Sequence, residues 1–101
     1  MKIDEYRAQI DQIDKQIVAL LEKRMEISEE IGIEKLELRG DILDPKREWE
    51  KLNGIKEATH HVAYREYMER IFIEIMAESR YLQKDIQASI EKDSARNSED
   101  M

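Results

Sequence analysis

Hydrophobic residues recur every three or four positions along the first 38 residues of the chain. This spacing predicts a helix from about Ile3 to Leu38 with one apolar face, which we call the heptad seam. The seam consists of Ile3, Tyr6, Ile10, Ile13, Ile17, Leu20, Arg24, Ile27, Ile31, Glu34 and Leu38. A face this regular is expected to be buried against other helices.

The predicted first helix is too long for the chain that carries it. It would span roughly 54 Å, whereas a compact domain of 100 residues has a radius of gyration of about 13 Å. Either the helix bends or a second chain covers the remainder. We favour a homodimer in which the long helices intertwine.

A second helix is predicted after the break at Arg39-Gly40-Asp41. Asp44 suits the N-cap of this helix and Pro45 suits its first position, and the pattern extends to about Ala58. Its apolar side carries Trp49, Leu52 and Ile55.

A third helix is predicted over about 62–90, with an apolar stripe that Ser79 and Gln83 interrupt at positions one turn apart. The polar stretch 91–101 has no periodicity and is expected to be a disordered tail. The pattern therefore predicts an all-α fold with three helices per protomer and one domain over residues 1–90.

Composition supports long helices and excludes several kinds of site. Charged residues make up 41% of the 101 residues, with 3 Gly and 1 Pro. Without cysteine, neither a disulfide framework nor a thiolate metal site can form, and the adjacent His60 and His61 do not suggest a metal centre. A net charge of -7 argues against nucleic acid as a partner. With no secretory leader and no apolar span, we expect a soluble, cytoplasmic protein that does not enter the membrane.

Arg24 departs most from the apolar character of the seam. A guanidinium cannot lose its charge, so its burial without an anionic partner would be very unfavourable. That partner is either a protein carboxylate, as is common for a lone arginine in a seam, or a ligand. Lys35 lies on nearly the same face about 16 Å further along the axis, so the two cations could grip one ligand. Arg7 lies roughly 25 Å before Arg24 and could share its pocket only across an antiparallel partner chain.

The remaining polar residues suit charge stabilisation better than covalent chemistry. The sequence offers no basis for a catalytic triad and no glycine-rich phosphate loop. Ser79 and Gln83 could simply join two helices by hydrogen bonds, and Arg47 and Glu48 could be surface charges. Taken together, cations with amide and hydroxyl groups favour a site that binds a dianion and stabilises charge that moves during a reaction.

Five short motifs follow one another in a defined order over residues 3–87. They are Arg7-x-x-Ile10-Asp11-x-x-Asp14, Leu20-Leu21-x-x-Arg24, Ile31-Gly32-x-x-Lys35, Asp44-Pro45-x-Arg47-Glu48 and Ser79-x-x-x-Gln83. Each motif alone is weak, but their order and spacing together resemble the all-helical chorismate mutases of the AroQ class. The resemblance implies an intertwined homodimer in which Arg7 of one chain completes the site of the other.

The resemblance also implies the reaction and a role for each site residue. The reaction is the Claisen rearrangement of chorismate to prephenate, a step of the shikimate pathway towards phenylalanine and tyrosine that needs no cofactor or metal. By this resemblance, Arg24 and Arg7 of the partner chain clamp the two carboxylates of chorismate, with Arg47 nearby. Lys35 and Gln83 are implied to donate hydrogen bonds to the ether oxygen. Asp44 and Glu48 are implied to help position the ring hydroxyl, and Ser79 to line the pocket. At 101 residues the chain is expected to be monofunctional.

Two alternatives remain open at this stage. A lyase that eliminates pyruvate from isochorismate would use a similar cationic pocket on the same scaffold. A non-catalytic helical dimerisation module would explain the heptads, but not Arg24 in the seam or the polar residues in the third helix. The complete set of Asp44, Arg47 and Glu48 with Ser79 and Gln83 favours the mutase.

Overall fold

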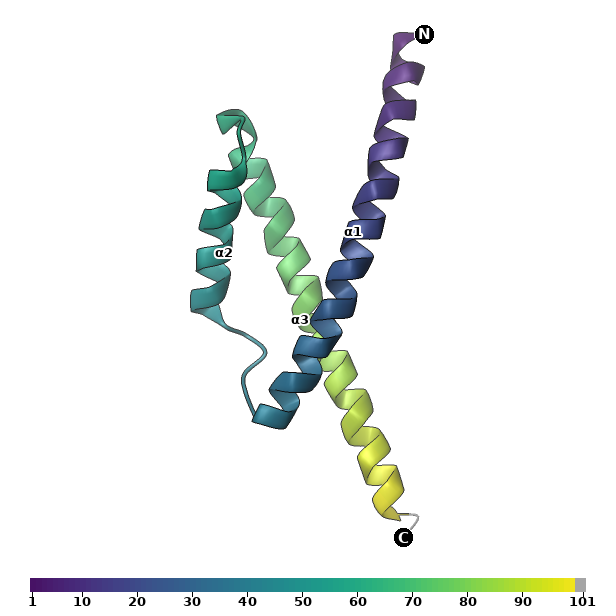
Figure 1. The fold of residues 1–101 in the computed structure, drawn as a ribbon, viewed down its shortest axis with the longest axis vertical. Coiled ribbons are helices and arrows are strands. Elements are labelled where there is room, and N and C mark those ends of the chain that lie inside the picture. Colours follow the sequence, from purple (N-terminus) through teal and green to yellow (C-terminus); the bar gives the residue numbers. More distant parts are fainter. Residues whose placement is uncertain (100–101) are drawn as a thin grey trace.

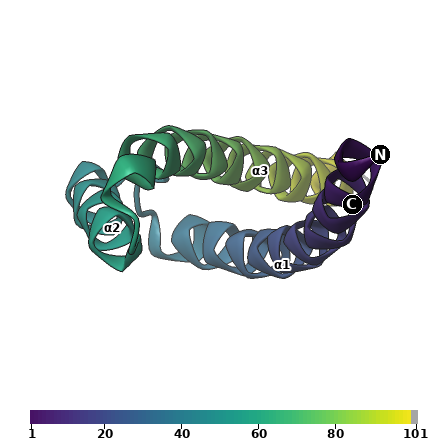
Figure 2. The same cartoon turned by 90° about the horizontal axis from the view of Figure 1, so that it is seen from above.

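The computed structural model describes residues 1–99 as three α-helices and one short 3-10 helix. α1 covers Lys2–Leu38, α2 covers Pro45–Ala58, and α3 covers Arg65–Glu99 after the 3-10 turn η1 at Val62–Tyr64. The predicted all-α class with three helices, one of them very long, is confirmed. The C-terminal half of α1 crosses α3 near the middle of α3, and α2 lies beside the N-terminal half of α3 (Figure 1). Seen from above, the two long helices lie in separate layers (Figure 2).

The break between α1 and α2 occurs where the sequence predicts it. α1 ends with Arg39 in the left-handed conformation, at a φ of 55°, and the backbone N–H of Gly40 donates to the carbonyl of Lys35 at 2.8 Å. The side chain of Asp44 caps α2 by accepting a hydrogen bond from the backbone N–H of Arg47 at 3.1 Å. These caps fix where the loop between the two helices begins and ends.

The predicted end of the third helix requires correction. α3 continues through Glu99, so residues 91–99 are helical and do not form the irregular tail that was expected there. The segment contains neither glycine nor proline, and it includes alanine, lysine, glutamate and arginine, which favour helix. A polar helix of this kind shows no apolar periodicity, which explains the error. The last two residues of the predicted tail lie outside the described residues.

Small side chains set the crossing of α1 and α3. Ser28 and Gly32 are buried on α1, and a Cβ on Gly32 would stand 3.1 Å from the Cα, Cβ and Cγ atoms of Gln83 on α3. The backbones therefore approach more closely than a larger residue would allow. Met76 of α3 is the only hydrophobic side chain buried within residues 1–99.

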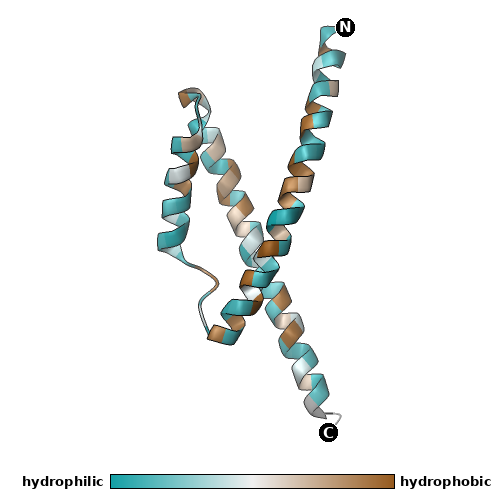
Figure 3. Ribbon diagram, in the orientation of Figure 1, coloured by the Kyte–Doolittle hydropathy of each residue, from teal (hydrophilic) through white to brown (hydrophobic). Residues whose placement is uncertain are grey.

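The heptad seam is exposed in the single chain. Its aliphatic side chains are between 44% exposed, at Ile31, and 72% exposed, at Leu38, and every residue from 1 to 20 is exposed. Hydrophobic residues recur along the whole of α1, including the N-terminal half that projects away from the other helices (Figure 3). α1 therefore meets α3 through the face of Ser28 and Gly32 and leaves the seam uncovered.

The chain is extended. Its radius of gyration is 18.4 Å and its longest dimension is 66 Å, against a radius of about 13 Å for a compact chain of this length. Trp49, which was expected on the packed side of the second helix, is 68% exposed because α2 turns Leu52 and Ile55 inward instead. No helix within residues 1–99 has an apolar stretch long enough to cross a bilayer.

The crossing predicts opposite effects for two glycine substitutions. Gly32→Ala should lower the free energy of unfolding by about 1 kcal/mol. Overpacking against Gln83 typically costs about 1–3 kcal/mol, which outweighs the roughly 0.5–1 kcal/mol that alanine gains in helix propensity. Gly54→Ala, with nothing within 4 Å of the added Cβ, should be stabilising by about that gain. Urea unfolding of both variants at one protein concentration makes the comparison. Equal stabilisation by both substitutions would show that the helices do not approach closely at Gly32.

Candidate active site

A cavity of about 510 Å³ opens beside the crossing of the long helices, bounded by α1, the following loop, α2 and α3. Its volume lies within the range of small-molecule sites. Seven of the eight predicted site residues line it, namely Arg24, Lys35, Asp44, Arg47, Glu48, Ser79 and Gln83. The crossing thus brings together side chains that are up to 59 positions apart in the sequence.

The cavity is cationic although the chain as a whole carries a charge of -7. Two carboxylates, of Asp44 and Glu48, face five cationic side chains, which are Arg24, Lys35, Arg47, Lys51 and Arg80. Among the side chains of residues 1–97, no carboxylate forms an ion pair with the guanidinium of Arg24 or Arg47. The alternative that a protein carboxylate of the same chain meets Arg24 is therefore not realised. An anionic ligand would supply the missing charge.

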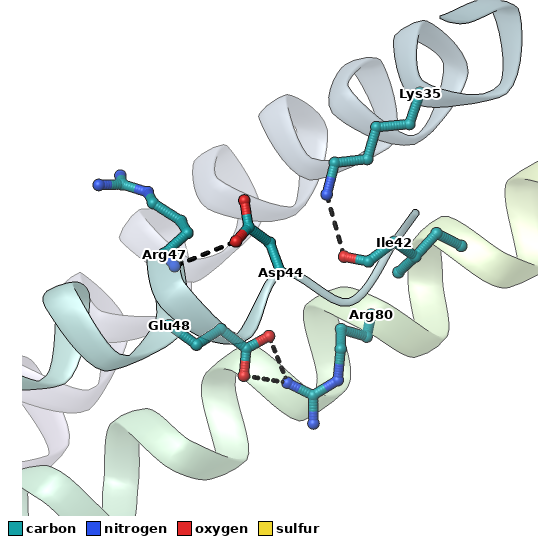
Figure 4. A network of polar contacts seen from close by, with 6 residues as sticks. All are labelled: Lys35, Ile42, Asp44, Arg47, Glu48 and Arg80. Atoms are coloured by element: carbon teal, nitrogen blue, oxygen red, sulfur yellow. Dashed lines mark hydrogen bonds and ion pairs between the residues drawn. The ribbon is translucent and has the colours of Figure 1, made fainter. Parts of the chain in front are cut away.

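Lys35 reaches the cavity from the last turn of α1. Its Nζ donates to the carbonyl oxygen of Ile42 in the loop at 3.0 Å (Figure 4). An ammonium group has three donors, so this bond orients the side chain and leaves donors for a ligand. Arg24, three turns earlier on nearly the same face, is half-buried.

The first turn of α2 supplies the acidic side of the cavity. Because Asp44 caps this turn, Arg47 and Glu48 lie at its start beside the cavity (Figure 4). Glu48 is not free, because Nη1 of Arg80 on α3 donates to its two carboxylate oxygens at 2.5 and 2.6 Å. Arg80 itself also lines the cavity.

A buried polar network joins α1 to α3 at the cavity wall. Ser28 shares a short hydrogen bond with the hydroxyl of Ser79, and its Oγ accepts from Nε2 of Gln83 at 3.0 Å. Gln83 is 6% exposed, and its Oε1 has no hydrogen-bond partner. A buried carbonyl oxygen without a donor is unfavourable. Rotation of the amide by 180° would let Oε1 accept from Ser28 and would free the NH₂ group for a ligand.

Arg7 stands apart from the other predicted site residues. It is exposed on the projecting part of α1 and does not line the cavity of its own chain. This position agrees with the helical separation from Arg24 that the sequence predicts, and it leaves the contribution of Arg7 to a second chain as a proposal.

Three polar residues of the site were not assigned a role from the sequence. Ser28 lies one turn after Arg24, and Lys51 lies one turn after Arg47, so helical spacing from a known site residue could have found both. The pairing of Arg80 with Glu48 depends on the packing of α3 against α2, which the sequence pattern does not specify. Among the side chains that the structure describes, residues 1–97, no group of three or more His, Asp or Glu is placed to hold a metal ion.

Comparison with known proteins agrees with this geometry. The family described as chorismate mutase type II matches residues 6–84, which is more than half of the chain and includes every predicted site residue. A search of curated proteins gives no match. The chain therefore belongs to the chorismate mutase type II family and is an isomerase that acts on chorismate.

Proposed function

We propose that chorismate binds as a dianion in the cavity between α1, α2 and α3 and rearranges there to prephenate. The observation that carries this proposal is the surplus of cationic side chains in the cavity of an acidic chain. Two of its arginines lack a carboxylate partner among the side chains of residues 1–97. A substrate with two carboxylates supplies the charge that these groups need. The rearrangement is intramolecular and requires no nucleophile, which agrees with a site built from charges and hydrogen-bond donors.

The arginines bind the two carboxylates in this proposal. Arg24 comes from α1 and Arg47 from the first turn of α2, and both side chains line the cavity. Together with Arg7 of the partner chain they hold the enolpyruvyl arm over the ring, because each guanidinium can bind a carboxylate through two parallel hydrogen bonds. Holding the reacting atoms in a near-attack arrangement removes much of the entropic part of the barrier.

Lys35 and Gln83 act on the bond that breaks. Negative charge develops on the ether oxygen in the transition state, and donors already aimed at that oxygen stabilise it without reorganisation. The Ile42 carbonyl orients the Lys35 ammonium. Ser28 holds the Gln83 side chain through its amide, and the rotated amide keeps its NH₂ group free for the ether oxygen. Asp44 and Glu48 help to position the ring hydroxyl, whose single O–H donates to one of the two carboxylates, and Ser79 lines the pocket.

A homodimer completes the site in this proposal. The exposed heptad seam and the single buried hydrophobic side chain within residues 1–99 leave the chain without a core of its own. A second copy that packs along the seam would bury these apolar residues. In an antiparallel pair of α1 helices whose offset brings residue 7 of one chain level with residue 24 of the other, the Arg7 of the second copy would also lie near the cavity.

The family match supports the mutase. It favours neither of the two alternatives, the isochorismate lyase and the non-catalytic dimerisation module. A cytoplasmic location and a role of the prephenate in phenylalanine and tyrosine biosynthesis stay predictions.

The reaction and its charge stabilisation are tested together. Purified protein should convert chorismate to prephenate and leave isochorismate unchanged, as identified by mass spectrometry. Lys35→Ala and Arg24→Ala should each lower kcat/KM by about 10²–10³-fold while circular dichroism shows an unchanged helix content, because each removes a positioned charge. Pyruvate release from isochorismate, or wild-type rates in either variant, would contradict the proposal.

The contribution of Arg7 across chains is tested by mixing inactive subunits. Arg7→Ala and Arg24→Ala homodimers should both be nearly inactive. When the two variants are unfolded together and refolded in equal amounts, half of the dimers combine one chain of each kind, and each of these has one intact site. About a quarter of the wild-type activity should therefore return. Each variant refolded alone is the control, and no recovery in the mixture would place Arg7 outside the partner's site.

A further inference from the structure

An ion pair closes one edge of the cavity. Nη1 of Arg80 on α3 donates to the two carboxylate oxygens of Glu48 on α2, with side chains that are 27% and 25% exposed. Figure 4 shows the carboxylate of Glu48 turned towards this nitrogen of Arg80. Both residues line the cavity, so the pair borders the space that the ligand enters.

A carboxylate in this position opposes the binding of an anion. Glu48 lies within a half-buried surface, where repulsion between like charges is screened less than in bulk water. Arg80 offsets this charge directly, and it also fixes which way the carboxylate points. The other cavity arginines differ, because no ion pair engages Arg24 or Arg47 within the described part of the chain.

We propose that Arg80 is a positioning residue, which neutralises Glu48 and holds its carboxylate beside the bound dianion without touching the ligand itself. This inference rests on the proposed function of the cavity. It divides the cavity arginines into two that remain available for the ligand and one that serves the carboxylate. Because a single guanidinium nitrogen contacts both oxygens, the charge of Arg80 matters more than the fork shape of its side chain.

The chain contains a matched control for this pair. Lys56 on α2 forms an ion pair with Glu69 on α3 at 2.7 Å, with side chains 39% and 32% exposed, and neither residue lines the cavity. Both pairs join the same two helices. Loss of the Lys56 pair therefore reports what the loss of an interhelical ion pair does when no ligand lies beside it.

Steady-state kinetics with chorismate test the proposal in six proteins, which are the wild type, Arg80→Met, Arg80→Lys, Glu48→Gln, the double variant Arg80→Met/Glu48→Gln, and Lys56→Met. Arg80→Met should raise KM about tenfold with a smaller change in kcat, because Glu48 then repels the dianion. Arg80→Lys, which retains the charge, should restore KM to within about threefold of the wild type. Lys56→Met should leave KM within about twofold.

The double variant decides whether Arg80 acts through Glu48. Glu48→Gln removes the charge that Arg80 neutralises, so adding Arg80→Met should change KM by less than about twofold. An equal tenfold increase in both backgrounds would show direct contact with the ligand and overturn the inference. An unchanged KM in Arg80→Met would also overturn it. An inert wild-type protein would overturn the proposed function and this inference together, whereas an active wild type with additive effects would overturn the inference alone.

Discussion

The close approach of α1 to α3 at Gly32 and Gln83 is the contact on which the rest of the structure depends. It is possible because Gly32 has no side chain and Ser28 has a small one. The crossing brings the C-terminal half of α1 beside the middle of α3, and it leaves the N-terminal half of α1 projecting away (Figure 1). The position of the cavity and the exposure of the heptad seam both follow from this arrangement.

The same crossing gathers more cationic than acidic side chains around the cavity. Cationic side chains from all three helices line the cavity, and Glu48 is already engaged by Arg80. Two of the hydrogen-bond donors in the cavity are held in place by the protein itself. The Ile42 carbonyl holds the Lys35 ammonium, and Ser28 holds the Gln83 amide. Preorganised donors stabilise developing charge without rearranging during the reaction, which is what an intramolecular rearrangement requires from a protein.

The helices and most of the cavity lining could be predicted from the sequence because they depend on local signals. Apolar spacing defines the helices. Asp44 and Pro45 predict the start of α2, and the helix begins there. Arg24 was conspicuous because a charge in an apolar stripe requires a reason. The order of the motifs then identified the polar residues that share the cavity.

Features that depend on tertiary packing could not be predicted in the same way. The seam indicated which face of α1 is apolar, but the face that meets α3 carries Ser28 and Gly32, which are too small to produce an apolar pattern. Trp49 fits the apolar spacing of α2 yet is exposed, because spacing does not determine how far a helix is rotated against its neighbour. The pair of Arg80 and Glu48 joins residues 32 positions apart and likewise depends on the packing of two helices.

A crystal structure of the protein with prephenate bound tests the central claim most directly. The account predicts prephenate in the cavity beside the α1–α3 crossing, with its carboxylates on Arg24 and on Arg7 of a second chain. Lys35 and Gln83 should face the keto oxygen of prephenate, which is the former ether oxygen. Prephenate bound elsewhere, or bound in the cavity of a monomer with Arg7 remote from it, would contradict the account.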